Sequence, residues 1–200
     1  MADEMVPELR AAADRLMHTS GYLHHLADEM RPKELDRHCK ATGLTVRQTI
    51  GHIVLWLEFE VGRNRRFLDG EGVLEESLDE HEVNRGFAEA SRETPVAELL
   101  ERYVHAYRAQ LEVYGRIAPE LAAQPVRGTT VAGLLLELTA HFQHHAVDFA
   151  EALPRLRFDP LLLDWALHPR SPDAAEAARQ DKLADAARAY LKSREDVHDS

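Results

Sequence analysis

Two histidines in the second half of the chain have the spacing of metal ligands. They belong to the run His141-Phe142-Gln143-His144-His145, in a segment whose apolar residues recur at helical spacing. Residues four apart lie on the same face of a helix, so His141 and His145 can point at one metal ion. His144 is turned by about 100° from His145, and we expect it to face another helix or solvent. The pair therefore predicts part of a metal site, which a further ligand must complete.

His52 is the best candidate for the third ligand. It lies in the apolar stripe of another predicted helix, directly before Ile53 and four residues before Trp56. An imidazole buried among apolar side chains is costly unless it is hydrogen-bonded or bound to a metal. Three neutral histidines with an open fourth position are typical of catalytic zinc sites. A metal held in this way would lower the pKa of a bound water or of a thiol cosubstrate.

Asp148 lies on the same helical face, three residues after His145 and seven after His141. It could serve as a fourth ligand, as an acceptor for an imidazole N–H, or as a general base, and it is our candidate catalytic residue. The residues alone leave simpler interpretations open. Asp148 could be an ordinary carboxylate near a helix end, and His52 could be a core histidine satisfied by a hydrogen bond. The spaced pair could arise by chance among 12 histidines.

The composition excludes several other classes of protein. The 200 residues include 24 Lys+Arg and 35 Asp+Glu, and the formal net charge of −11 argues against a nucleic-acid binder. We find no apolar run that could span a bilayer and no signal peptide, so we expect a cytoplasmic protein that does not insert into membranes. Cys39 is the single cysteine, which excludes an intramolecular disulfide and a multi-cysteine metal site. Any thiol chemistry therefore needs a thiol from a cosubstrate.

Four long segments with helical periodicity predict an all-α fold, an antiparallel four-helix bundle whose interior can hold a site built by facing helices. The segments run from Pro7 to about Met30, from Thr45 to about Leu68, from Thr94 to before Pro119, and from Gly128 to before Pro154. Thr45 and Gln48 predict a capping box at the start of the second segment. Pro95 is expected at the first helical position of the third. Residues 73–93 should form an irregular connection with a short helix around Glu80–Ala90.

The chain divides into two parts. We expect residues 1–153 to form the bundle with the metal site, and residues 154–200 to form a C-terminal extension. A Pro-containing connection, Leu153–Pro172, leads to an amphipathic stretch, roughly Pro172–Ser193, which predicts one further helix. That helix could pack on the bundle and cap the site, or it could lie at the interface of a homodimer.

Both histidine motifs resemble those of a known family. Residues 45–53, which begin with Thr-Val-Arg-Gln and include His52, are similar to the opening of the second helix in the DinB/YfiT-like superfamily. Residues 141–145 are similar to its His-x-x-His-His stretch on the fourth helix. The superfamily includes the N-terminal domains of mycothiol-dependent maleylpyruvate isomerases and the ClbS-like proteins. The resemblance covers about residues 7–153, with the motifs in the same order.

The resemblance implies an up-down-down-up four-helix bundle, often dimeric, with a divalent metal (zinc, nickel or manganese) on three histidines. Carried over position by position, the ligands are His52, His141 and His145. Two departures from the family pattern are visible: Leu44 stands where an aromatic residue usually precedes the Thr-Val pair, and residues 146–148, Ala-Val-Asp, replace a frequent Arg-Gly-Gln. The His-x-x-Asp ending is closer to the mycothiol-linked branch.

Together with the resemblance, the sequence predicts a metal-dependent enzyme acting on a small molecule. It would be a hydrolase, or a thiol S-transferase in which a low-molecular-weight thiol binds at the open position of the metal. A non-catalytic protein that binds or sequesters a metal or a small molecule is the alternative. The chain lacks the two Glu-x-x-His pairs of a ferritin-like di-iron site, the His-Glu-x-x-His of a zinc protease, and a P-loop. The acidic charge disfavours a helix-turn-helix regulator.

Overall fold

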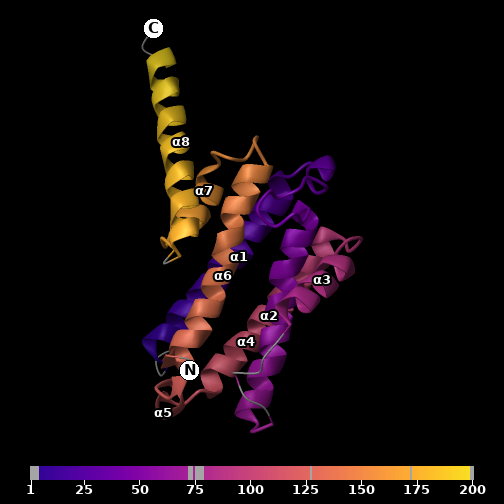
Figure 1. Ribbon diagram of the computed structural model, residues 1–200, viewed down its shortest axis with the longest axis vertical. Helices are drawn as coiled ribbons and strands as arrows, with labels where there is room; N and C mark the ends of the chain where they lie inside the picture. Colours follow the sequence, from indigo (N-terminus) through magenta and orange to yellow (C-terminus); the bar gives the residue numbers. More distant parts are fainter. Residues whose placement is uncertain (1–4, 72–73, 75–78, 127, 172, 199–200) are drawn as a thin grey trace.

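The computed structural model describes residues 5–71, 74, 79–126, 128–171 and 173–198, and these residues are mostly helical (Figure 1). The elements in chain order are α1 (Pro7–Glu29), the 3₁₀ helix η2 (Pro32–Glu34), α2 (Val46–Leu68), α3 (Glu80–Ala90), α4 (Val96–Arg116), α5 (Pro119–Ala122), β1 (Pro125–Val126), β2 (Thr129–Thr130), α6 (Val131–Ala152), α7 (Pro160–Leu167) and α8 (Ala174–His198). The two strands pair into a short antiparallel hairpin. The fold is all-α apart from this hairpin, as predicted, and the short helix expected around residues 80–90 is present as α3.

Some expectations fall on residues that the structure does not describe. These are residues 72–73 and 75–78 of the expected connection, and Pro172 at the expected start of the last helix. Among the described residues, none of the helices is long and apolar enough to cross a membrane.

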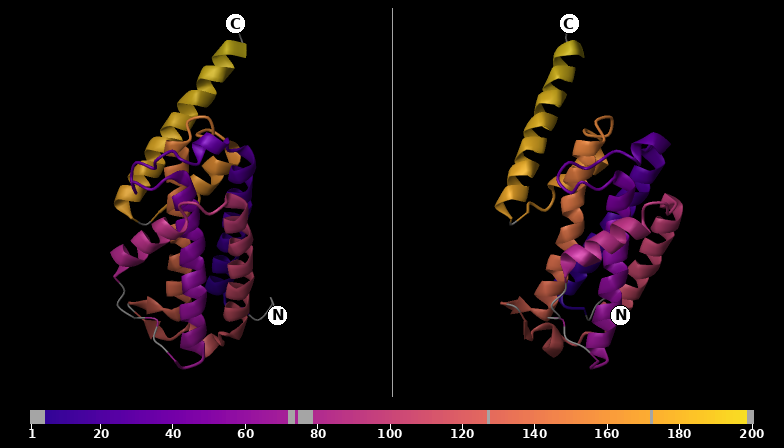
Figure 2. Two further views of the ribbon diagram at one scale, coloured as in Figure 1. Left: turned by 90° about the vertical axis from the view of Figure 1, so that its right-hand side faces the viewer. Right: turned by 45° about the vertical axis from the view of Figure 1, so that its right-hand side comes forward.

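α1, α2, α4 and α6 form a four-helix bundle. α1 packs against α4 and α6, and α2 packs against the same two helices, so α1 and α2 occupy diagonal corners. Figure 1 shows α1 and α6 running in one direction and α2 and α4 in the other, and Figure 2 shows the same bundle from two further sides. This is the up-down-down-up arrangement that the family resemblance implies. Because α2 and α6 are neighbours of opposite direction, residues near the start of α2 face residues in the last turns of α6.

Local signals set the starts of the two helices that carry the histidines. The hydroxyl of Thr45 accepts a hydrogen bond from the backbone N–H of Gln48, and the side chain of Gln48 accepts one from the N–H of Thr45. This confirms the expected capping box at the start of α2. Thr130 caps α6 by accepting from the N–H of Gly133. Pro95 is the N-cap of α4 rather than its first helical residue, so α4 begins one residue later than expected.

The C-terminal extension contains two helices where the sequence predicts one. α7 forms within the expected connection, because Asp159 caps it by accepting from two backbone N–H groups and Pro160 occupies its first position. Its Trp165 is buried against Phe149 of α6. α8 packs on α6 and α7 and then projects beyond the bundle (Figures 1 and 2). The extension is thus anchored to the helix that carries two of the histidines.

Gly51, the residue before His52, allows the end of α3 to approach α2 closely. A Cβ at position 51 would lie 2.1 Å from the Cβ of Ser91 and 2.5 Å from its hydroxyl oxygen. Ser91 is fully buried at the C-terminal end of α3. Close-packed interiors have no room for such an addition. A larger residue at position 51 must therefore displace backbone beside His52.

We expect Gly51→Ala to lower the free energy of unfolding by about 1–3 kcal/mol, because overpacking forces the backbone to shift. Gly62→Ala is the matched control on the same helix, since a Cβ there has nothing within 4 Å. The control should be neutral or stabilising by up to about 1 kcal/mol. Urea unfolding followed by circular dichroism measures both variants. Equal stability of the two would contradict the close approach of α3 to α2.

Candidate metal centre

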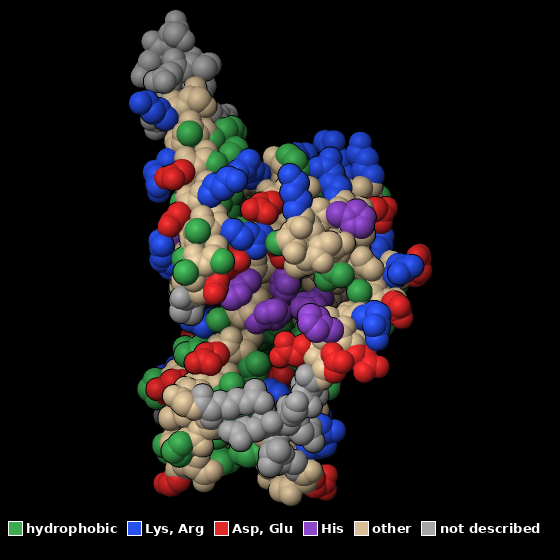
Figure 3. Space-filling view, in the orientation of Figure 1, with side chains coloured by type: hydrophobic (Ala, Val, Ile, Leu, Met, Phe, Trp, Pro, Cys, Tyr) green, Lys and Arg blue, Asp and Glu red, His purple; other side chains and the backbone are tan. Residues whose placement is uncertain are grey.

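His52 of α2 and His141 and His145 of α6 come together in the structure. Each offers one ligand atom, and these atoms all lie within 4.8 Å of one another. His52 and His145 are each 5% exposed, whereas His141 is the exposed member of the group. Figure 3 shows histidine side chains gathered beside a hollow on one face of the molecule, with Asp and Glu side chains below them. The three rings form one cluster, which is open to solvent on the side of His141.

Trp56, four residues after His52 on α2, packs beside the ring of His52. The ring of His52 meets that of Trp56 edge-on, with the ring centres 6.2 Å apart. The indole N–H of Trp56 donates to Oδ1 of Asn84 at 2.8 Å. Its ring also packs edge-on against Phe59 and Phe87. Trp56 thus joins α2 to α3 and borders the histidine cluster at the same time.

The spacing of the nitrogens suits a small divalent ion. Nε2 of His52 lies 3.1 Å from Nε2 of His141. Two nitrogens bound to a tetrahedral zinc ion at about 2.0–2.1 Å would be about 3.3–3.4 Å apart. A single N–H···N hydrogen bond between the two rings would have a similar length. Such a bond leaves His145 out, whereas a shared metal ion engages all three rings.

His145 distinguishes these two arrangements. Its Nδ1 donates to Oδ2 of Asp148 at 2.9 Å, and in the neutral ring this leaves the free lone pair on Nε2. This Nε2 is buried and has no hydrogen-bond partner among the described residues. A buried acceptor without a partner is unfavourable, and a metal ion in the cluster would satisfy it. The residues present therefore fit a metal ion.

The type and the protonation state of the ligand atoms limit which metal ions suit the site. Three imidazole nitrogens suit zinc or nickel, whereas magnesium, calcium and manganese prefer oxygen ligands. Loss of solvent around the ring, and then the neighbouring His145 and His141, lower the pKa of His52 to about 3. The pKa of His141 is lowered in the same direction by loss of solvent and by His145 and His144. His52 and His141 are therefore neutral at neutral pH, which is the state that binds a metal.

Arg179 of α8 is a part of the centre that sequence spacing does not reveal. Its guanidinium donates to Oδ1 of Asp148 at 2.7 Å, and it also pairs with Glu151 and Glu176. Both oxygens of Asp148 are thus engaged, one by His145 and one by Arg179. Burial acts to raise the pKa of Asp148, but the bonds from His145 and Arg179 outweigh it and hold this pKa below its usual value. Asp148 is therefore an ionised acceptor that fixes the ring of His145.

The extension contacts α6 at two further points beside the histidines. Nε2 of His144 lies 3.2 Å from the hydroxyl of Ser171, so His144 faces the extension rather than the cluster, as expected. The amide of Gln143 donates to the backbone oxygen of Pro169 at 2.6 Å. Gln180 of α8 donates to the same oxygen and accepts from the N–H of Ser171. These bonds dock the segment between α7 and α8 against α6, next to the candidate centre.

Cys39 lies outside the cluster. It is fully buried, and its Sγ accepts a hydrogen bond from the hydroxyl of Thr49. Burial raises the pKa of its thiol to about 11. The thiolate is the reactive form of cysteine, so this side chain is a poor nucleophile at neutral pH.

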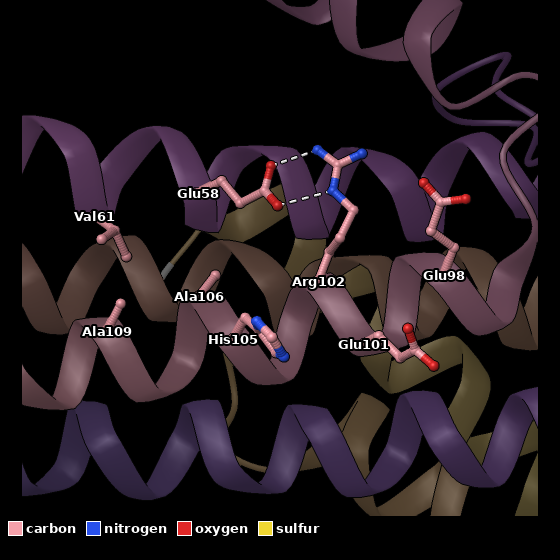
Figure 4. A pocket seen from close by; sticks show the side chains of 8 residues that line it. All are labelled: Glu58, Val61, Glu98, Glu101, Arg102, His105, Ala106 and Ala109. Atoms are coloured by element: carbon pink, nitrogen blue, oxygen red, sulfur yellow. Dashed lines mark hydrogen bonds and ion pairs between the residues drawn. The ribbon is translucent and has the colours of Figure 1, made fainter.

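A cavity of about 390 Å³ between α2 and α4 is separate from the candidate centre, because its lining contains none of the three histidines. Glu58, Glu98 and Glu101 line it together with Arg102 and His105. Figure 4 shows the guanidinium of Arg102 paired with both oxygens of Glu58. Since that cation is already compensated, the remaining charge of the lining is acidic.

The fold is an up-down-down-up helical bundle, and a cluster of three histidines that could hold a metal ion lies on two of its neighbouring helices. A family model described as the DinB superfamily matches residues 15–147. The chain belongs to the DinB superfamily, which is often metal-binding. The match contains His52, His141 and His145 and ends one residue before Asp148. No curated protein and no solved structure matches the chain.

Loss of the hydrogen bonds that orient His145, between His145 and Asp148 and between Asp148 and Arg179, should weaken metal binding. We expect Asp148→Asn to lower the affinity for zinc about 10–100-fold and Arg179→Gln to lower it about tenfold, because residues that orient a ligand tune its affinity. Arg188→Gln is the matched control, since Arg188 is exposed on the same helix and pairs with Asp185 away from the cluster. Competition with a fluorescent zinc chelator measures all three. Wild-type affinity in Arg179→Gln would contradict a role for α8 in the centre.

Proposed function

We propose that this protein is a metal-dependent enzyme that acts on a small molecule, with a divalent ion held by His52, His141 and His145. The observation that carries the proposal is the buried Nε2 of His145, which has no partner among the described residues although Asp148 fixes its ring. Zinc suits three imidazole nitrogens, nickel is the next candidate, and manganese is less well matched. A bound ion would act as a Lewis acid and lower the pKa of a water molecule or a thiol at its open position.

The chain's own residues would prepare the site for this chemistry. Asp148, held by Arg179, keeps the proton of His145 on Nδ1 and so presents Nε2 to the metal. His52 and His145 are buried and keep water away from one side, whereas His141 is exposed and marks the side from which a substrate can enter. In this proposal Asp148 acts by positioning His145, because both of its oxygens are already engaged.

Two reactions agree with this arrangement, hydrolysis and a thiol-dependent transfer. The chain's own thiol is unsuited to either, since Cys39 is buried and its pKa is raised to about 11. A thiol S-transferase would therefore use a low-molecular-weight thiol as cosubstrate, which would enter from the side of His141. In hydrolysis a water molecule would take the same place.

A non-catalytic protein that binds or sequesters a metal or a small molecule is the second candidate function. One observation favours it. Asp148, the carboxylate in contact with a ligand histidine, has both oxygens engaged and is not free to act as a base. The two functions share the same three ligands and differ in turnover, which an assay can measure.

Protein purified without a histidine tag should take up about one zinc or nickel ion per chain. His141→Ala should lose most of this metal, because two ligands do not close a transition-metal site. His105→Ala is the control, since His105 is exposed on α4 and lies outside the cluster. Plasma mass spectrometry after incubation with zinc and desalting measures occupancy. Full occupancy in His141→Ala would refute the ligand assignment, and an empty wild-type protein would refute the proposal.

A turnover assay separates the enzyme from the binding protein. We expect the zinc-loaded protein to accelerate either the hydrolysis of an activated ester or the reaction of cysteine with an electrophile. The rate should vanish in His141→Ala and persist in His105→Ala, because only the first variant lacks a ligand. A rate that survives metal removal would contradict metal-dependent chemistry. Stoichiometric metal binding without turnover in both assays would favour the binding function.

A further inference from the structure

Another cavity of about 390 Å³ lies between α8 and the rest of the protein. The loop before α2, the last turn of α6, the loop that leads to α7, and α8 itself form its walls. The lining residues are Lys40, Glu151, Arg157, Arg179, Lys182 and Leu183. Figure 3 shows Lys and Arg side chains along the cleft between α8 and the rest of the molecule, on the face that carries the histidines. Four of the six lining residues are cationic, in a chain whose net charge is −11.

The positive charge of this cavity is only partly compensated. Arg179 is paired with three carboxylates, and one of them is Glu151 in the cavity wall. Lys40, Arg157 and Lys182 have no carboxylate partner within the part of the chain that the structure describes. Arg179 thus serves three carboxylates and adds no free positive charge, whereas Lys40, Arg157 and Lys182 outnumber Glu151, the single carboxylate of the lining.

Arg157 is the least exposed of these three cations, since it is half-buried whereas Lys40 and Lys182 are exposed. Its guanidinium carbon lies 5.4 Å from the centre of the Phe158 ring. Its Nε is buried and has no acceptor among the described residues. A partly buried cation without an acceptor is unfavourable. An anion beside the guanidinium would compensate it.

We propose that this cavity binds a small dianion, and that the phosphate group of a metabolite is the ligand that suits it best. A guanidinium can donate two parallel hydrogen bonds to phosphate oxygens, and the two ammonium groups add charge around them. The cavity between α2 and α4 provides the contrast, because its size is similar but its free charges are carboxylates. The cavity adjoins the candidate metal centre through Arg179, but the other three cations of its lining, Lys40, Arg157 and Lys182, are not among the candidate ligands.

Isothermal titration calorimetry of the full-length chain with inorganic phosphate tests the site. Ionic strength is kept constant, because salt screens exposed charges. We expect saturable binding whose affinity falls at least about tenfold in the double variant Lys40→Gln/Lys182→Gln. Arg157→Gln should cause a similar loss of affinity. Arg157→Lys keeps the positive charge but not the pair of parallel N–H donors, and it should cause a smaller loss.

The matched control is the double variant Lys33→Gln/Lys192→Gln, which removes two exposed lysines outside the cavity, one of them on α8. Its affinity for phosphate should stay within about twofold of wild type, since distant exposed charges are screened. His141→Ala should also bind phosphate normally. Acetate at the same ionic strength, as a monoanion, should bind far more weakly.

Three results would overturn the proposal. The first is the absence of saturable phosphate binding to the wild-type chain. The second is an equal loss of affinity in the two double variants, which would indicate a general charge effect. The third is a loss confined to His141→Ala, which would place the phosphate at the histidine cluster. The metal titrations leave Lys40, Arg157 and Lys182 unchanged, so either proposal can fail while the other stands.

Discussion

Three imidazole rings on two helices must meet at one point, and this requirement governs the structure around them. His52 can reach His141 and His145 only because α2 and α6 are neighbours of opposite direction, with the start of one beside the end of the other. The capping box of Thr45 fixes where α2 begins and hence the rotation at which His52 leaves the helix. Gly51 then lets α3 close against the same turn. The bundle thus brings two buried polar rings together at a place where apolar packing alone would exclude them.

A histidine that is to bind a metal must direct an unprotonated ring nitrogen at it. In His145, the groups that fix which nitrogen carries the proton include a residue outside the four-helix bundle. The carboxylate of Asp148 keeps the proton of His145 on Nδ1. A buried carboxylate needs a partner of its own, and Arg179 supplies it from α8. The bonds of His144 and Gln143 to Ser171 and Pro169 hold the extension in place for this contact. The last helix is therefore coupled to the histidine cluster through a continuous line of hydrogen bonds.

The parts of this arrangement that are local in sequence could be predicted from it. The shared face of His141 and His145, the turning of His144 away from the cluster and the capping box at Thr45 all depend on residues at most four apart, where helical geometry decides the outcome. The all-α class followed from apolar periodicity over long segments. Metal binding itself stays a prediction, although the structure brings the expected ligands together.

What could not be predicted depends on tertiary contacts. Arg179 lies 31 residues after Asp148 and becomes its partner only when α8 docks on α6. α7 lies in a segment whose prolines indicate a connection without a helix. A Pro at the first helical position can start a helix as readily as it ends the preceding one. The short hairpin of β1 and β2 has too few residues for an alternating pattern.

The family match covers only some of the residues that build the site and its surroundings. The match covers residues 15–147 and includes the three candidate ligands, whereas Asp148, Arg157, Arg179 and Lys182 all follow it. Ligand type selects the metal, while the residues behind the ligands tune how strongly it is held and what can approach it. Proteins with the same three histidines but different C-terminal segments should therefore offer a metal the same donor atoms and differ in affinity and in what can approach the site. In the proposed enzyme, the residues that decide the reaction are then to be sought where the extension meets α6, rather than among the histidines themselves.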